Sequence, residues 1–304
     1  MADPMIDVSG AALLDAADDL VAASPGRQAL AMFVRNRAAV VGFVLFVLIV
    51  FMTLFGPTLY GVDPFKIVWA PHTAPLDTAD AAPLLGTDYL GRDVTAGIIG
   101  GGRATLTVAA IAAGMSVTIG LVLGSLAGFY GGWVDIVLMK VTEFFQVLPA
   151  LLFAMVLVTL FEPGVWTIAF AIGVVAWPST ARLTRAEFLR LRNLEFVKAA
   201  RAMGASDLRI ILRVVLPNAL PPLIVSTTLV VGVAILFEAG LGFLGLSDPN
   251  VWSWGQMIGS NRSYFLTSWW SVTLPGMAIF VTVLSISLIG DGLQDAFNPK
   301  LRER

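Results

Sequence analysis

Residues 104–134 read ATLTVAAIAAGMSVTIGLVLGSLAGFYGGWV, and no charged side chain interrupts this run between Arg103 and Asp135. An α-helix needs about 20 predominantly apolar residues to cross the hydrocarbon core of a bilayer. The run exceeds that length and therefore predicts a membrane-spanning helix.

The composition of the whole chain agrees with a lipid environment. Of the 304 residues, 57% are hydrophobic and 13% are charged, whereas roughly 25% of the residues of an ordinary soluble domain are charged. The chain has no cysteine and a single histidine, His72. Disulfides, thiolate metal sites and cysteine nucleophiles are therefore excluded, and a histidine-rich metal site or a serine–histidine triad is disfavoured.

Five further uncharged runs resemble membrane spans in length. Two of them are parted only by Glu162, which together with Pro163 and Gly164 indicates a tight turn. The sequence thus predicts an all-α polytopic membrane protein with about six transmembrane helices. The five runs are residues 38–62, 144–161, 163–181, 214–237 and 263–290.

The distribution of lysine and arginine predicts the orientation. Cytoplasmic loops are enriched in these residues, and a cytoplasmic N-terminus leaves only Lys66, Arg92, Arg103 and Arg262 outside. Both termini are therefore expected in the cytoplasm. The inside set holds 15 of the 19 basic residues, namely Arg27, Arg35, Arg37, Lys140, Arg182, Arg185, Arg190, Arg192, Lys198, Arg201, Arg209, Arg213, Lys300, Arg302 and Arg304.

The chain divides into a tail and a membrane domain. Residues 1–34 begin with an acidic stretch that lacks the basic start of a secretory signal, so they are expected to form a cytoplasmic tail. Residues 35–304 form the predicted transmembrane domain, with a long outer loop at 63–103 and a basic cytoplasmic loop at 182–217. Long loops on a membrane scaffold are where function is expected.

The cytoplasmic loop has the pattern of a helical hairpin. A short helix is expected to end at Gly204, which suits the left-handed residue of a helix terminus. Ser206 can cap a second helix and Asp207 can favour its positive end. That second helix is expected to stop near Pro217. One interpretation is a surface hairpin whose arginines bind anionic lipid. The expected apolar faces comprise Ala199, Ala200 and Met203 on the first helix, and Leu208, Ile211, Leu212 and Val215 on the second.

A second interpretation comes from a resemblance. The run from Lys198 to Pro217 resembles the EAA loop of ATP-binding-cassette importer permeases, although Lys198 stands where that family has glutamate. The matching residues are Ala199, Ala200, Gly204, Val214, Leu216 and Pro217. The resemblance implies a coupling helix that docks in an ATPase subunit. The implied ATPase-coupling residues are Lys198, Ala199, Ala200, Met203, Gly204, Ser206 and Asp207.

The outer loop carries a second resemblance, to the second permease subunit of dipeptide, oligopeptide and nickel importers. It rests on residues 85–94 and 102–106, and further stretches at 128–135, 243–246, 254–255, 290–295 and 298–302 extend it over about residues 30–304. Leu84 departs from the family's usual histidine, and Ala96 and Gly97 from its Ser-Arg pair. These differences leave the class unaffected.

The residues of the outer signature also have a physical interpretation. Gly86 and Gly91 permit tight turns, while Asp88, Arg92 and Asp93 can satisfy one another and nearby amides. A folded cap over the outer mouth is favoured over direct substrate contact. The candidate residues are Gly86, Thr87, Asp88, Gly91, Arg92, Asp93 and Arg103.

Glu238 follows the uncharged part of the fifth predicted span. An intramembrane carboxylate is costly and suggests a function. Glu238 could line the transport path, or it could pair with Arg103 or Arg262, which is the preferred interpretation. The aromatic residues Trp252, Trp254, Trp269 and Trp270 fit an outer interfacial belt.

The resemblance implies a transport subunit of a bacterial cell membrane. Its implied partners are a second homologous permease subunit, two ATPase subunits or domains, an extracytoplasmic peptide-binding protein and the lipid bilayer, without nucleic acid. No Gly-x-x-x-x-Gly-Lys-Ser/Thr loop occurs, so ATP and magnesium are expected on the partner ATPases, and no cofactor or catalytic residue is expected in this chain.

Three alternatives remain open. The transported solute could be nickel or another small molecule in place of peptide. A polytopic membrane enzyme would need convergent acids, bases or metal ligands, and a proton-coupled carrier would need more buried charge than Glu238. Neither of the last two explains the loop from Lys198 to Pro217.

Overall fold

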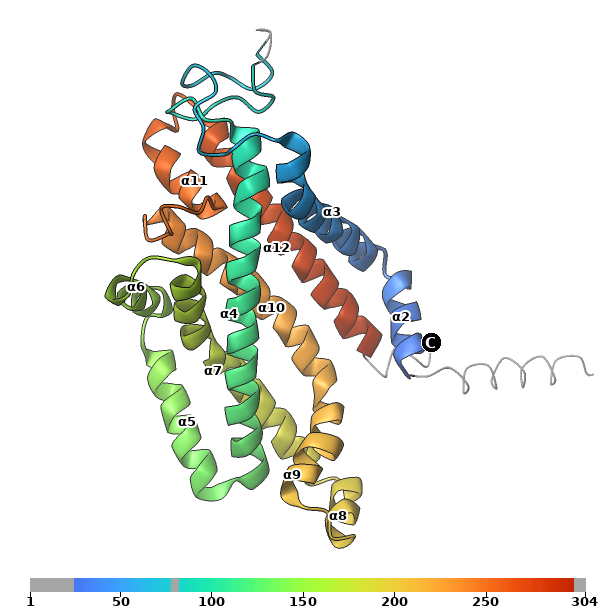
Figure 1. The fold of residues 1–304 in the computed structure, drawn as a ribbon. Helices are drawn as coiled ribbons and strands as arrows, with labels where there is room; N and C mark the ends of the chain where they lie inside the picture. Colours follow the sequence, from blue (N-terminus) through green and yellow to red (C-terminus); the bar gives the residue numbers. More distant parts are fainter. Residues whose placement is uncertain (1–24, 78–81, 298–304) are drawn as a thin grey trace, which may run out of the picture.

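The computed structural model describes residues 25–77 and 82–297, and this part of the chain is mostly helical, without a strand (Figure 1). The helices are α2 (Pro25–Arg35), α3 (Arg37–Tyr60), α4 (Val94–Tyr130), α5 (Gly132–Val147), α6 (Ala150–Leu160), α7 (Val165–Leu191), α8 (Glu195–Ala202), α9 (Asp207–Ile210), α10 (Leu216–Phe243), α11 (Trp254–Asn261) and α12 (Trp270–Phe297). A π-helical turn, Ile211–Val215, joins α9 to α10, and a 3₁₀ turn, Arg262–Tyr264, follows α11. The expected basic tail residues Lys300, Arg302 and Arg304, and most of the tail 1–34, lie outside the described residues.

Several helices are long and apolar enough to cross a membrane. In the described part there are 4, namely α3, α4, the continuous stretch Asp207–Phe243 and α12, and α5 with α6 makes a fifth if the bent pair is one span. The prediction of a multi-spanning helical protein is confirmed. The predicted span 163–181 lies in α7, whose C-terminal third is charged and which is not among these candidates. The count of six and the orientation remain predictions.

The predicted continuous span at 144–161 is wrong. Helix α5 already begins at Gly132, and α5 and α6 meet at an angle of 88°. Pro149 causes the break, because proline has no backbone N–H to donate and forces the residue before it into an extended conformation. Leu148 accordingly has φ −70° and ψ 133°. The turn expected at Glu162 to Gly164 is present between α6 and α7.

Helix α4 is the central element of the bundle and packs along α7 (Figure 1). Its contact face carries glycine at every fourth position. Added Cβ atoms at Gly120, Gly124 and Gly128 would lie 2.6 Å from the Cβ atoms of Thr180, Thr184 and Phe188, respectively. Small residues at this spacing let membrane helices approach closely, which gains van der Waals contact where lipid provides no hydrophobic drive.

Two element boundaries differ from the sequence prediction. Helix α4 begins at Val94 instead of Ala104, because the Asp93 side chain caps it; Arg103 therefore lies on a helix and not in the outer loop. The second hairpin helix does not stop at Pro217 but continues into α10. Pro217 lacks an N–H, and the preceding π turn, in which Leu216 N bonds to Ile211 O, takes up the shift.

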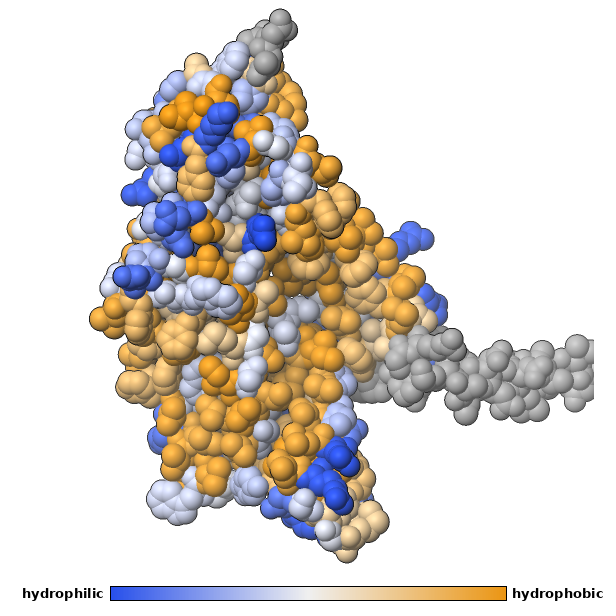
Figure 2. Space-filling view, viewed as in Figure 1, coloured by the Kyte–Doolittle hydropathy of each residue, from blue (hydrophilic) through white to orange (hydrophobic). Residues whose placement is uncertain are grey.

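The outer surface of the bundle is largely apolar, as Figure 2 shows. Helix α3 is the extreme case, since only 17% of its most hydrophobic window is buried within the molecule. Exposed large side chains on it include Phe43, Leu48, Phe51 and Phe55. Such a surface needs lipid or another apolar protein against it.

Candidate functional site: a helical hairpin and a loop cap at opposite ends of the bundle

The hairpin of α8 and α9 projects from one end of the bundle, opposite the outer loop (Figure 1). Helix α8 ends as predicted at a left-handed glycine, with φ +80° at Gly204. The N–H of Ala205 donates to the carbonyl of Ala200 at 3.1 Å, and that of Gly204 to Arg201 at 3.0 Å. These bonds close the end of the helix and reverse the chain.

The two faces of α8 have different surroundings. Ala199 is exposed and Met203 is 81% exposed, whereas Val197 and Ala200 are buried against the body of the protein. Ala200 therefore does not share the outward face with Ala199 and Met203, which corrects the predicted ridge. Residues three and four apart share a helix face. Ala200 therefore lies on the same face as Val197, and this face packs against the body of the protein.

The polar residues of the hairpin also differ in part from the prediction. Lys198 Nζ lies 2.8 Å from Glu195 Oε1, so it has a local partner. Ser206 occupies the N-cap position, but its side chain makes no capping hydrogen bond. Asp207 Oδ1 lies 3.9 Å from Arg201 Nη2.

The second helix buries a different face from the one expected. Ile211 and Val215 are buried as predicted, but Leu208 and Leu212 are 65% and 52% exposed. The π turn at Ile211–Val215 rotates the residues within and after it relative to a regular helix, so a period of 3.6 does not describe this face from Leu212 onward.

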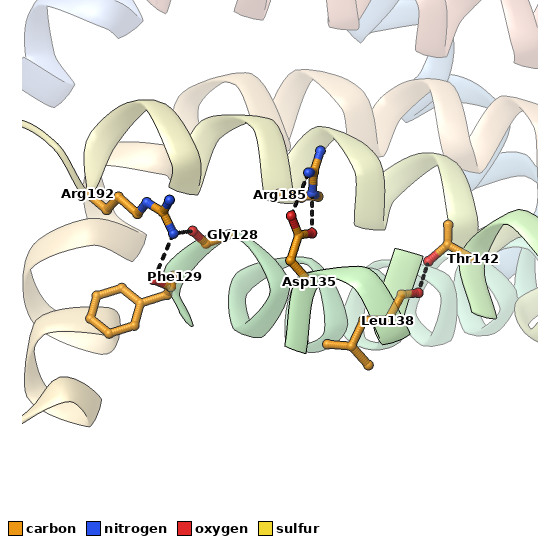
Figure 3. Close-up of polar contacts among 7 residues, drawn as sticks. All are labelled: Gly128, Phe129, Asp135, Leu138, Thr142, Arg185 and Arg192. Carbon is orange, nitrogen blue, oxygen red and sulfur yellow. Dashed lines mark hydrogen bonds and ion pairs between the residues drawn. The ribbon is translucent and has the colours of Figure 1, made fainter. Parts of the chain in front are cut away.

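Polar contacts fasten the base of the hairpin to the bundle (Figure 3). Arg192, which follows α7, donates through Nη1 to the carbonyls of Gly128 at 3.0 Å and Phe129 at 3.2 Å, at the end of α4. Arg185 of α7 makes two bonds to Asp135 of α5, one of them 2.6 Å from Nη2 to Oδ2. Three helices thus meet at one corner beside α8, and sequence reasoning did not find this corner.

The outer loop forms a folded cap, and its glycines are required by geometry. Gly86 and Gly91 have φ of +75° and +84°, and a Cβ at either would collide with a backbone carbonyl. Thr87 connects the cap to the bundle, because its carbonyl accepts a bond of 3.0 Å from Trp270 Nε1. The cap is therefore continuous with the packed core. Trp252, Trp254 and Trp270 are buried, and of the four tryptophans expected in an interfacial belt only Trp269 is exposed.

Asp93 joins three parts of the outer end. Its Oδ1 accepts from the N–H of Thr95 at 2.7 Å and of Ala96 at 3.3 Å, and its Oδ2 accepts from the Tyr60 hydroxyl at 2.6 Å. One carboxylate therefore caps α4 and ties it to the end of α3.

The expected pairing of aspartate with arginine in the cap is wrong, whereas the expected contact of these aspartates with nearby backbone amides is confirmed. Among the described residues no ion pair joins Arg92 to Asp88 or Asp93. Asp88 Oδ1 accepts instead from the N–H groups of Leu90 at 2.9 Å and Arg92 at 2.8 Å. The Arg92 guanidinium lies over the ring of Trp252, 5.1 Å from its centroid. The turn between Asp88 and Arg92 brings these backbone amides to the Asp88 carboxylate.

Two substitutions of Asp88 distinguish the stability contributed by its hydrogen bonds from the stability contributed by its charge. Burial raises the pKa of its carboxyl, against the opposing effect of the amides of Arg92 and Leu90; the protonated form is therefore favoured by folding, and this advantage is lost as the pH rises through the folded-state pKa. Asp88→Ala should lower the free energy of unfolding by about 2–3 kcal/mol, since two amides lose their acceptor. Asp88→Asn keeps an acceptor and no charge, and should cost under about 1 kcal/mol. Thermal unfolding in detergent would measure both, and equal losses would contradict this account.

Glu238 is buried at the junction of α10, α4 and α11, with 2% of its surface exposed. The expected pairing with Arg103 or Arg262 is wrong. The hydroxyl groups of Thr105 and Ser253 lie near its carboxylate, and within the described residues its Oε2 has no hydrogen-bond partner. Arg262 donates to backbone carbonyls, and Arg103 is exposed and lines an outer cavity of about 330 Å³. Glu238 is therefore a packed polar residue of the helix junction.

A groove runs along α10, and the sequence did not predict it. Two adjoining cavities of about 480 and 470 Å³ share Ser226 and Leu229 of α10. Their walls are mostly apolar, with Gln146, Ser179 and Gln294 among the polar lining residues. Because α10 is apolar on all sides, periodicity alone gives no sign of which face is open.

The helical bundle, with the hairpin of α8 and α9 at one end and the cap at the other, defines the class as a multi-pass α-helical membrane protein. Residues 120–303 match the family described as "Binding-protein-dependent transport system inner membrane component", and residues 24–83 match the "N-terminal TM domain of oligopeptide transport permease C". The chain belongs to the family of inner membrane components of binding-protein-dependent transport systems. It is therefore a transport subunit of the inner membrane and not an enzyme, as predicted.

Curated relatives match over nearly the whole chain. The Di/tripeptide transport system permease protein DppC of Pseudomonas aeruginosa is 40% identical, covering 93% of this chain and 95% of its own. The Oligopeptide transport system permease protein OppC of Bacillus subtilis is 33% identical over 91% and 90%.

The fold has a counterpart among solved structures. A chain from inward facing conformations of the MetNI methionine ABC transporter superposes with a TM-score of 0.56 at 20% identity, covering 66% of this chain and 97% of that one. The similarity concerns the fold alone. The family matches and the curated relatives confirm the resemblance to importer permeases that the sequence indicated.

Proposed function

We propose that this chain is a permease subunit of an ATP-driven importer of dipeptides or oligopeptides and forms half of the translocation pathway. The observation that carries the proposal is the 40% identity to a di/tripeptide permease over 93% of the chain. The projecting hairpin supports it, because it offers a short helix with exposed Ala199 and Met203 to a cytoplasmic partner.

The proposed assembly contains a second homologous permease subunit, two ATPase subunits and an extracytoplasmic peptide-binding protein. The residues proposed to contact the ATPase are the outward ones of the hairpin, above all Lys198, Ala199 and Met203, with Gly204 fixing the turn. ATP and magnesium would bind to the ATPase partners. The cap formed by residues 63–77 and 82–93 would face the binding protein.

Six spans with both termini in the cytoplasm are part of the proposal. Asn36 Nδ2 donates to Asp295 Oδ2 at 2.9 Å, so the start of α3 and the end of α12 lie on the same side (Figure 1). The number of crossings must then be even. Counting α7 as a span and the bent α5–α6 pair as one gives six.

The corner shown in Figure 3 suggests how movement of the hairpin reaches the spans. Arg192 joins the hairpin base to the end of α4, and Asp135 with Arg185 joins α5 to α7. A displacement of α8 by the ATPases would therefore move three helices together, as a rigid-body transition requires. The groove along α10 is the proposed wall of the pathway, since its few polar groups leave it open to varied peptides.

Uptake by the reconstituted importer tests the proposed function. The complete complex, expressed from the genes that accompany this one and placed in proteoliposomes with its binding protein, should accumulate labelled dipeptide only with ATP inside. The same vesicles should not accumulate nickel. ATP-dependent uptake of nickel without peptide uptake would replace the peptide assignment, and turnover by this chain alone would support an enzyme.

A further inference from the structure

A polar cavity lies beside the hairpin, at the corner where α4 ends. Its volume is about 460 Å³ and it is lined by Phe129, Tyr130, Arg192, Asn193, Arg201 and Asp207. Two of these residues are cationic and one is anionic, so the cavity carries an excess positive charge. Of its lining residues only Asp207 belongs to the predicted ATPase-coupling set, and none lines the groove along α10.

The two arginines that line the cavity could bind one ligand together, because each has N–H groups without a close acceptor. Arg192 uses Nη1 for the carbonyls of Gly128 and Phe129, and within the described residues its Nε and Nη2 have no acceptor. The Arg201 guanidinium lies 5.7 Å from the centroid of the Phe129 ring, and its nearest carboxylate oxygen, on Asp207, is 3.9 Å away. A phosphate group accepts several such donors at once, with a geometry that suits guanidinium.

In the proposed topology the cavity lies on the cytoplasmic side, near the inner surface of the membrane. Tyr130 and Trp133 are 50% and 79% exposed at this corner, and aromatic residues gather at the level of lipid headgroups. The adjoining surface of α5 is apolar, with Ile136 and Val137 more than half exposed. Figure 2 shows hydrophilic side chains over α8 and α9 at the lower right and an apolar surface over α5 at the lower left. A lipid could therefore keep its chains along α5 while its headgroup enters the cavity.

We propose that this cavity binds the phosphate headgroup of an anionic phospholipid of the inner leaflet. The bound headgroup bridges Arg192, at the end of α7, and Arg201, on the coupling helix. It thereby stiffens the link between the hairpin and α4, so that the coupling of ATP hydrolysis to peptide import depends on anionic lipid. This regulation rests on the proposed transport function, whereas the lipid site itself does not.

Lipid retention on the purified importer tests the site. The complex is placed in nanodiscs of phosphatidylcholine with or without phosphatidylglycerol, and retained phosphatidylglycerol is counted by native mass spectrometry. Arg201→Gln should weaken retention about fivefold. Asp207→Asn removes the one carboxylate that lines the cavity and should strengthen it. Arg209→Gln is the matched control, because Arg209 is exposed on α9 and does not line the cavity.

The outcomes separate the site from the proposed function. Equal loss of retention in Arg201→Gln and Arg209→Gln, or no change in Asp207→Asn, would overturn the site. Restoration of coupling in pure phosphatidylcholine by inorganic phosphate would assign it to a soluble anion and overturn the lipid proposal. ATPase activity per peptide imported should fall when phosphatidylglycerol is added to the wild type but not to Arg201→Gln. Absence of peptide uptake with normal lipid retention would reject the proposed function alone.

Discussion

Replacing Gly204 with valine is expected to reduce peptide import at least about tenfold, with normal insertion into the membrane. Gly204 has φ +80°, and a Cβ built there meets nothing within 4 Å. The substitution therefore causes no collision with a neighbour and acts only through the backbone. A left-handed conformation costs an L-residue about 1–2 kcal/mol, and β-branching adds to this. The end of α8 would unwind, and Ala199 and Met203 would lose their fixed position for the ATPase.

Asparagine at position 204 is the control, because it adopts the left-handed conformation more readily than other non-glycine residues. Gly204→Asn should retain most of the import, although its side chain is larger than that of alanine. The measurements are ATP-dependent uptake in proteoliposomes and the amount of ATPase subunit that co-purifies. If asparagine and valine were equally harmful, the cause would be the side chain and not the turn. Normal uptake by the valine variant would reject the coupling role of this hairpin.

Local rules correctly predicted the end of α8, because a single glycine, Gly204, determines it. The same rules failed where two elements meet. Ala200 faces the core since Val197 does, and that arrangement depends on Phe129 and Phe188 of other helices. The period of a short helix says which residues share a face, but not which face lies against the protein.

The charged residues were misjudged for a related reason. Arg92 and Glu238 were each assigned an oppositely charged partner, as isolated charges in a membrane would require. Arg92 instead lies over an aromatic ring, and Glu238 has the hydroxyl groups of Thr105 and Ser253 nearby. These partners are distant in sequence and are themselves uncharged. Charge patterning therefore gave no sign of them.

The glycine row of α4 could have been predicted from the sequence. Gly120, Gly124 and Gly128 repeat at the four-residue spacing that favours close helix packing in membranes. The sequence does not say which helix packs there, because several runs offer small residues. The structure identifies α7 as that helix, through Thr180, Thr184 and Phe188.

Gly124→Leu is expected to lower the free energy of unfolding by about 3 kcal/mol or more, the upper range for overpacking a well-filled interior. Even a Cβ at this position would lie 2.6 Å from the Cβ of Thr184 and would also meet the backbone of Ala181. The backbone cannot move aside without separating α4 from α7 along the length of the bundle. The yield of monodisperse protein and the thermal midpoint in detergent would measure the loss.

Gly114→Leu on the same helix makes the comparison decisive. A Cβ at Gly114 meets nothing within 4 Å, and the residue is exposed. The substitution adds the same side chain and gains about 1 kcal/mol of helix propensity over glycine, so the purified single chain should be as stable as the wild type or more so. The difference between the two variants then measures the close approach of α4 and α7, free of any general effect of leucine in a membrane helix. Similar thermal midpoints for the two would mean that this approach does not hold the bundle together, and that the long α4 is positioned by its contacts with α10 instead.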